Sequence, residues 1–195
     1  MRARHIMLAV MPTAAVILFA LVACVPVDGG DPGTSPAPTD SSSPSASPTT
    51  QPSSPPTGVP VTIGCEQLVS AQAIYDYNPN FSLQADYSPA AGSLGAQAIE
   101  QRGIACSWIN QTSGEIIEIA VAQLPEPELT ALKNDLVMTS NSVPTYDVEG
   151  YFEVDGGVGV AQAFPGPYWL TGSSTTFFEP GDAAPLIAAA VAGLG

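Results

Sequence analysis

The sequence predicts an α+β domain over residues 61–195, built on an antiparallel sheet of about five strands in hairpins, with about four helices packed mainly on one face and one disulfide. Three observations predict this class. Apolar and polar residues alternate in several segments that short Gly-containing breaks separate, as in hairpins. Segments whose apolar residues have helical spacing occur before, between and after the predicted strands, instead of alternating strictly with them. Two cysteines, Cys65 and Cys106, lie in the same stretch.

The first half of this domain combines two helices with one hairpin. Ser70 and Ser93 stand where a hydroxyl caps the first turn of a helix, and Gly103 follows the second helical segment. The sequence Gln-Thr-Ser-Gly at 111–114 breaks two alternating segments, and Cys106 and Trp108 then share one face. We therefore expect helices at residues 70–77 and 93–102, and strands at residues 104–109 and 115–123.

The second half places a further run of strands between two helices. Pro127 favours a first helical turn, and Asp182 can cap the last helix. Asp-Gly-Gly at 155–157 and Pro-Gly-Pro at 165–167 separate the alternating segments, which predicts an antiparallel meander. We expect helices at residues 126–138 and 182–194, strands at residues 146–154, 158–164 and 168–171, and an edge segment at residues 175–178.

The N-terminal region has the pattern of an export signal. Arg2 and Arg4 precede an almost uncharged apolar stretch that ends at Leu21-Val22-Ala23-Cys24. A basic start, a short apolar run and small residues at the end are typical of a cleaved signal peptide, expected here at residues 1–23. The run is near the lower limit for a membrane-spanning helix, the alternative interpretation, but its internal proline favours cleavage.

The tetrapeptide Leu-Val-Ala-Cys resembles the lipobox of bacterial lipoproteins. The resemblance implies that Cys24 carries a diacylglycerol and becomes the first residue of the mature chain. Acyl chains on this cysteine would hold the protein on the outer face of the cytoplasmic membrane. The membrane, reached through this lipid, is therefore an expected partner.

Residues 24–60 are predicted to be a disordered tether that follows the lipid anchor. From residue 25 to residue 60 there are ten Pro, eight Ser and five Thr, with no aromatic residue. Such a composition offers too little apolar surface to form a core, so an extended chain is expected.

The charge and the histidine content exclude several function classes. The chain has 18 acidic residues, and after loss of the signal Arg102 and Lys133 are the only cations, a net charge of about −16. Nucleic acid is therefore not an expected partner, because its recognition depends on Lys and Arg contacts with phosphate. The single histidine, His5, lies in the signal, which excludes Ser-His-Asp and Cys-His catalysis and His-ligated zinc.

Cysteine counting predicts the disulfide. With Cys24 lipidated, Cys65 and Cys106 are the remaining pair, and a pair exported from the cytoplasm normally oxidises.

Three short motifs carry a resemblance to a known group. Cys65-Glu-Gln-Leu68 is followed by Cys106-Ser-Trp108, and a late Gly-Val-Gly-Val begins at Gly157. This arrangement resembles a group of actinobacterial secreted lipoproteins of unknown function and, more distantly, extracellular sensor modules of membrane kinases. The resemblance implies an α+β domain with a disulfide, and it implies no particular chemistry.

Acidic residues at alternate positions form the densest charge in the chain. Asp147, Glu149, Glu153 and Asp155, with Tyr151 between them, would share one face of a strand. Carboxylates beside a turn could bind a hard cation such as calcium, although a solvated strand face shows the same alternation. The four acids are therefore candidate metal ligands.

Two further hypotheses concern ligands and catalysis. Tyr168 and Trp169 are neighbours on a strand, so one would face outward if the other is buried, which makes them a candidate binding patch. Carboxylate pairs drawn from Glu115, Glu118, Glu149 and Glu153 could hydrolyse a cell-wall glycoside.

Together these features predict a lipid-anchored extracytoplasmic binding or adaptor domain without a cofactor, whose partner is an envelope protein or a small ligand. The alternative is a carboxylate-dependent cell-wall hydrolase.

Overall fold

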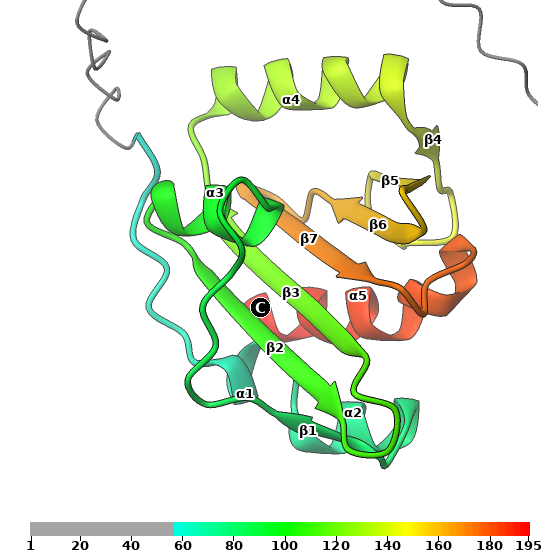
Figure 1. The fold of residues 1–195 in the computed structure, drawn as a ribbon. Coiled ribbons are helices and arrows are strands. Elements are labelled where there is room, and N and C mark those ends of the chain that lie inside the picture. The colour runs from blue at the N-terminus through cyan, green and yellow to red at the C-terminus, as the bar shows by residue number, and fades with distance from the viewer. Residues whose placement is uncertain (1–56) are drawn as a thin grey trace, which may run out of the picture. The chain divides into compact units, whose positions relative to one another are not determined.

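A computed structural model describes residues 57–195. The expected signal peptide, Cys24 and most of the expected tether lie outside these residues. Strands in the described part form one antiparallel sheet in the order β1-β2-β3-β7-β6-β5-β4 (Figure 1). The strands are β1 (Phe81–Leu83), β2 (Ile104–Asn110), β3 (Ile116–Gln123), β4 (Asn141–Ser142), β5 (Gly150–Asp155), β6 (Val158–Ala163) and β7 (Tyr168–Ser174).

The sheet consists of two runs of hairpins joined in its middle. Strands β1 to β3 are consecutive neighbours, as are β4 to β7, and the last strand of each run pairs with the other. The junction between β3 and β7 extends from Ile117 opposite Ser174 to Gln123 opposite Tyr168. The predicted antiparallel hairpins are confirmed, but the sheet has seven strands instead of about five, because the short edge strands β1 and β4 carry too few residues for a readable alternation. Residues 175–178, expected as an edge strand, form a turn and bend.

Five helices accompany the sheet, where four were expected. They are α1 (Cys65–Leu68), α2 (Ala71–Tyr77), α3 (Leu94–Glu100), α4 (Glu126–Thr139) and α5 (Pro180–Leu194). The additional helix, α1, is a single turn. Helices α1, α2 and α5 contribute to one buried cluster, and α3 and α4 contribute to a second cluster on the opposite face. The sheet is therefore covered on both faces, whereas the helices were expected mainly on one face.

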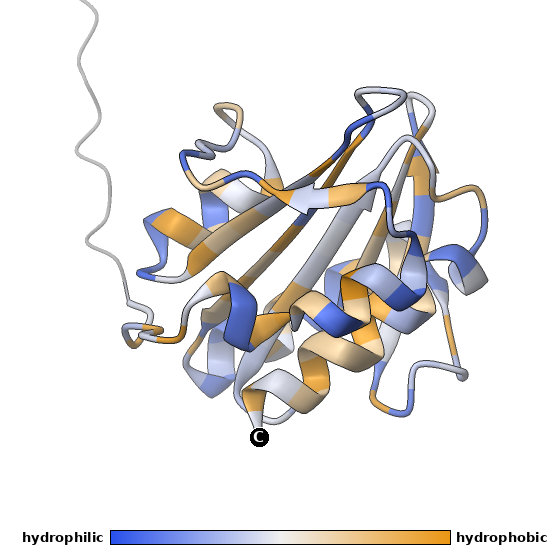
Figure 2. Ribbon diagram, turned by 90° about the horizontal axis from the view of Figure 1, so that it is seen from below, coloured by the Kyte–Doolittle hydropathy of each residue, from blue (hydrophilic) through white to orange (hydrophobic). Residues whose placement is uncertain are grey.

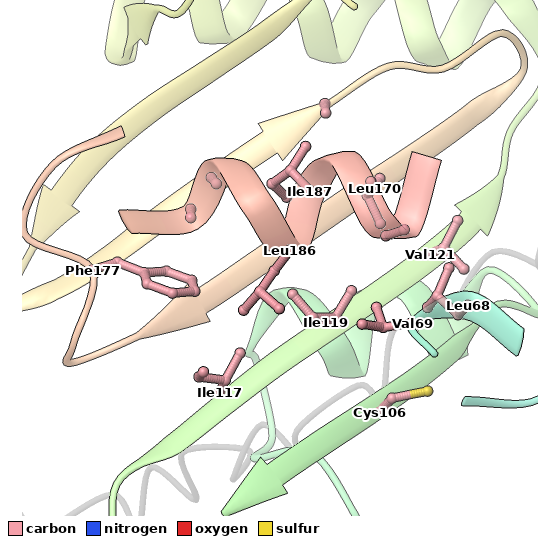
Figure 3. Close-up of a cluster of buried hydrophobic side chains, with 14 of the residues drawn as sticks. Leu68, Val69, Cys106, Ile117, Ile119, Val121, Leu170, Phe177, Leu186 and Ile187 are labelled. Atoms are coloured by element: carbon pink, nitrogen blue, oxygen red, sulfur yellow. The ribbon is translucent and has the colours of Figure 1, made fainter. Parts of the chain in front are cut away.

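Large side chains fill the core beneath α5. Ile117 and Ile119 of β3 lie near Leu186, and Val121 of the same strand lies beside Leu68 (Figure 3). Hydrophobic positions continue along α5 in the view from below (Figure 2). Each of these fully buried side chains contributes about 1.5–3 kcal/mol of transfer free energy relative to an exposed position.

The opposite face of β3 carries small residues, which lets α3 lie close to the sheet. Ala120 and Ala122 face this side, and Ala98 of α3 is buried with them. Gly103, expected as the residue that ends the helix, has a different role. The left-handed conformation that follows α3 belongs to Arg102, with φ 65°. A Cβ on Gly103 would lie 2.1 Å from the carbonyl oxygen of Val121, so this position requires glycine for close packing.

Two of the predicted helix caps, Ser70 and Ser93, are present. The hydroxyl of Ser70 accepts a hydrogen bond from the nitrogen of Ala73, and that of Ser93 accepts one from Ala96. Asp182, expected to cap the last helix, instead lies at the third position of α5, which begins at Pro180, and forms a capping box with the cap residue Glu179.

The disulfide between Cys65 and Cys106 is also present. It joins α1 to β2, with the two Cα atoms 5.6 Å apart and 41 positions apart in the sequence. Within residues 57–195, none of the helices has the length and apolar character needed to cross a membrane.

Candidate functional site

The two aromatic residues of the predicted binding patch point to opposite faces of β7. Trp169 is 3% exposed, and its indole nitrogen donates a hydrogen bond to Oε1 of Gln162 at 2.8 Å. Tyr168 is half-buried against the cluster on the α5 side. Because helices cover both faces of the sheet, the pair does not form a shared exposed patch.

Trp169 nevertheless contributes to a surface hollow between α3 and α4, which we call the α3–α4 hollow. Its volume is about 210 Å³. Leu124, Leu132 and Trp169 supply its apolar part, and two carboxamides and two carboxylates supply its polar part. The full lining consists of Gln97, Glu100, Gln101, Leu124, Glu128, Leu132 and Trp169.

The chain enters the domain beside this hollow. The hydroxyl of Thr57 donates a hydrogen bond to Oε2 of Glu128 at 2.6 Å, and Oε1 of Gln101 accepts from the nitrogen of Gly58 at 3.2 Å. The nitrogen of Val59 then donates to the carbonyl of Gln123 at the end of β3. Residues 57–60, expected as part of the tether, therefore contact the domain, and two residues that line the hollow hold them.

The predicted row of acids on one strand face is not formed in full. Glu153 and Asp155 belong to β5, but Asp147 and Glu149 precede it, and Asp147 adopts a left-handed conformation with φ 41°. The strand begins later than alternation suggested because the chain bends at these residues before it pairs. Within the described residues, no group of three or more His, Cys, Asp or Glu side chains is placed to hold a metal ion.

Glu149 is instead engaged by Lys133 and Tyr151. Nζ of Lys133 lies 2.9 Å from Oε2 of Glu149, and the Tyr151 hydroxyl donates to Oε1 at 3.0 Å. The hydrogen bond from Lys133 is the main cause that lowers the pKa of the Glu149 carboxyl. Nζ of Lys133 also lies 5.2 Å from the ring centroid of Phe164, within cation–π range.

Glu118 is the charged residue that the structure buries. It is 6% exposed, and its carboxylate accepts hydrogen bonds from the Tyr87 hydroxyl and, at 3.1 Å, from the nitrogen of Gly95. Burial, followed by the hydrogen bond to Glu118 and the charge of that carboxylate, raises the pKa of Tyr87. A single acid inside the apolar run Ile116–Ala122 was the sequence signal for this feature, because a lone charge there must find partners on folding.

The register of the sheet separates the carboxylates proposed for glycoside hydrolysis. Glu118 lies opposite Ser173, which lies opposite Val160, which in turn lies opposite Glu153. Three interstrand steps of about 4.8 Å place the Cα atoms of Glu118 and Glu153 about 14 Å apart. Hydrolytic carboxyl pairs are about 5–9.5 Å apart, less than this Cα separation.

No family model, curated protein or solved structure matches the chain.

Proposed function

We propose that the protein is a lipid-anchored, extracytoplasmic binding or adaptor domain that takes its ligand in the α3–α4 hollow. The N-terminal sequence supports the anchor, since Arg2, Arg4 and the apolar stretch lead to the lipobox-like Cys24. The disulfide between Cys65 and Cys106 supports an oxidising compartment. These two features together support the proposed placement on the outer face of the cytoplasmic membrane.

The observation that carries the binding role is the composition of the hollow. An indole and two leucines provide apolar contact, while Gln97 and Gln101 provide donors and acceptors around them. This combination of an apolar lining with a few polar groups is typical of small-ligand sites. Glu100 and Glu128 give the lining a negative charge, and among the described residues neither Lys nor Arg lines it. The hollow therefore favours a neutral or cationic ligand with an apolar part.

The position of the hollow suits an adaptor held near a membrane. Thr57 and Gly58, the first described residues, are hydrogen-bonded to its lining residues Glu128 and Gln101. A ligand that binds here lies beside Thr57 and Gly58 and shares the side chains of Glu128 and Gln101 with them.

The anchor is tested by replacing the cysteine that would be lipidated. Cys24→Ala should remove the protein from the membrane fraction and abolish incorporation of labelled palmitate, because a protein without acyl chains loses its stable membrane attachment. Retention of the variant at unmodified levels would refute the anchor and leave the binding site untouched.

The hollow is tested by filling it. Leu132→Trp adds bulk to its lining, and Val137→Trp adds the same side chain on the same helix at a position that is 62% exposed. Photo-crosslinking on intact cells, followed by mass spectrometry, should return an envelope component with the unmodified chain and with Val137→Trp but not with Leu132→Trp. Equal crosslinking by all three proteins would overturn the assignment of the hollow.

A further inference from the structure

A second hollow, separate from the α3–α4 hollow, opens where Glu118 is buried. Its volume is about 220 Å³, and it lies between the segment that carries Tyr87 and the strands β3, β6 and β7. Glu118 and Tyr87 contribute the polar pair described above. Ile116 and Val158 contribute apolar side chains, and Ser93 and Ser173 contribute hydroxyls. We call this feature the Glu118 hollow.

Among the residues that the structure describes, no cation pairs with the buried carboxylate of Glu118. Its two partners, the Tyr87 hydroxyl and the Gly95 nitrogen, are both neutral donors. Over residues 57–195, the ion pair of Lys133 is made with Glu149, and Arg102 donates to the carbonyl of Gly58. A carboxylate can accept about four hydrogen bonds, so the two present leave capacity for a further donor.

A buried carboxylate without a charged partner is costly, and a cation in the adjoining hollow would offset that cost. We propose that the Glu118 hollow binds an alkylammonium group, with the Glu118 carboxylate as its counter-ion and the side chains of Ile116 and Val158 around its alkyl chain. This site is additional to the function proposed for the α3–α4 hollow and does not depend on it.

Charge and polarity favour this class of ligand over others. The chain carries 18 acidic residues against four basic ones, so its field attracts cations and repels anions. Ile116 is 41% exposed and Val158 is half-buried, which leaves apolar surface beside the carboxylate. A small inorganic cation would gain nothing from these side chains, whereas an alkyl chain would be removed from water by them.

The test uses the exported full chain with Cys24→Ala, so that lipid does not interfere. Titration with n-butylammonium chloride, followed by the NMR shift of the Gly95 amide, should show saturable binding. Butan-1-ol, which has the same alkyl chain without the charge, should produce no saturable shift. Binding by both compounds with equal affinity, or by neither, would overturn the proposal.

Two variants connect the binding to the carboxylate. Glu118→Gln should weaken butylammonium binding about tenfold or more, because the counter-ion is lost. Glu115→Gln makes the same change of charge at an exposed position three residues away and should leave binding unchanged. Equal affinity of both variants would contradict the role of Glu118.

A third variant covers the case in which Glu118→Gln fails to fold. Ser173 lies directly opposite Glu118 across β3 and β7, so Ser173→Lys supplies an ammonium group from the protein itself. This variant should have a higher Tm and should no longer bind butylammonium. Unchanged butylammonium binding by Ser173→Lys would refute the site.

The source of the ammonium group is distinguished by a second probe. The blocked peptide acetyl-Gly-Lys-Gly-amide carries the same butylammonium chain on a backbone. If this peptide binds at least as tightly as n-butylammonium, the site accepts a lysine side chain of a polypeptide. If only n-butylammonium binds, the site accepts small amines. Leu132→Trp should bind both probes like the unmodified chain, because it alters only the α3–α4 hollow. A negative result at the Glu118 hollow is therefore distinguishable from a negative result at the α3–α4 hollow.

Discussion

The backbone nitrogen of Gly95 donates a hydrogen bond to Oε1 of Glu118 at 3.1 Å, although the two residues are 23 positions apart. This contact fixes the first turn of α3 against β3. A Cβ on residue 95 would lie 2.4 Å from Oε2 of the same carboxylate. Glycine is therefore required at this position for the carboxylate and the helix to occupy their places together.

Replacement of this glycine should be strongly destabilising. Gly95→Ala forces the Glu118 carboxylate away from its donors, and we expect the free energy of unfolding to fall by about 2–4 kcal/mol, as measured by urea unfolding. Gly181→Ala is the matched control, because the nearest atom to its Cβ would be 3.7 Å away, and it should be neutral or slightly stabilising. Equal stability of the two variants would contradict the close packing of α3.

The disulfide should account for a large share of the stability. Closing the loop between Cys65 and Cys106, which are 41 positions apart, restricts the unfolded chain by about 4 kcal/mol in the loop-entropy estimate. A reducing agent should lower the urea midpoint of the unmodified protein accordingly. The double variant Cys65→Ala/Cys106→Ala should unfold at the lower midpoint with or without reductant, and a response of this variant to reductant would point to another cause.

The ion pair between Lys133 and Glu149 should stabilise the fold at neutral pH but not at acidic pH. The pKa of Glu149 is lowered by Lys133, so the stabilisation is present above the unfolded pKa of about 4.3 and is lost as pH falls through the folded value. Glu149 is half-exposed, which limits the effect to about 0.5 kcal/mol. Glu149→Gln should therefore lower Tm at pH 7 but not at pH 3, and Glu153→Gln is the control. A loss of Tm that is equal at both pH values would be inconsistent with the pair.

Tyr146 should contribute to unfolding at alkaline pH. Burial, with the charge of Asp182 as a second cause, raises the pKa of Tyr146 to about 12. Since the unfolded value is about 10, stability that is complete below pH 10 is lost as pH rises from 10 to 12.

Absorbance at 295 nm during titration measures this ionisation. Tyr146→Phe should remove one late-ionising tyrosine and reduce the loss of stability between pH 10 and 12. It should also cost about 1 kcal/mol at neutral pH, because the hydrogen bond from its hydroxyl to the carbonyl of Pro180 is lost. Tyr75→Phe, at a position that is 63% exposed, should leave the ionisation between pH 10 and 12 unchanged. If the ionisation between pH 10 and 12 is undiminished in Tyr146→Phe, it belongs to another residue.

Local sequence was sufficient to predict the elements that have local signals. Ser70 and Ser93 cap helices as expected, Gly-containing breaks mark the hairpins, and counting paired Cys65 with Cys106. The elements α1, β1 and β4 were not predicted, because two to four residues show no period that could be recognised. The site was predicted only in part, since Trp169 lines the α3–α4 hollow but does so from a buried position.

Sequence by itself determined the class of fold, the disulfide partners and the acidic charge, because composition, spacing and counting contain that information. Tertiary structure alone decided the pairing of β3 with β7, the second helical layer and the burial of Glu118. Those three features follow from contacts between residues far apart in the chain, such as Gly95 with Glu118 and Ile117 with Ser174. Such contacts depend on which faces pack together, and a local pattern of residues does not specify its distant partner.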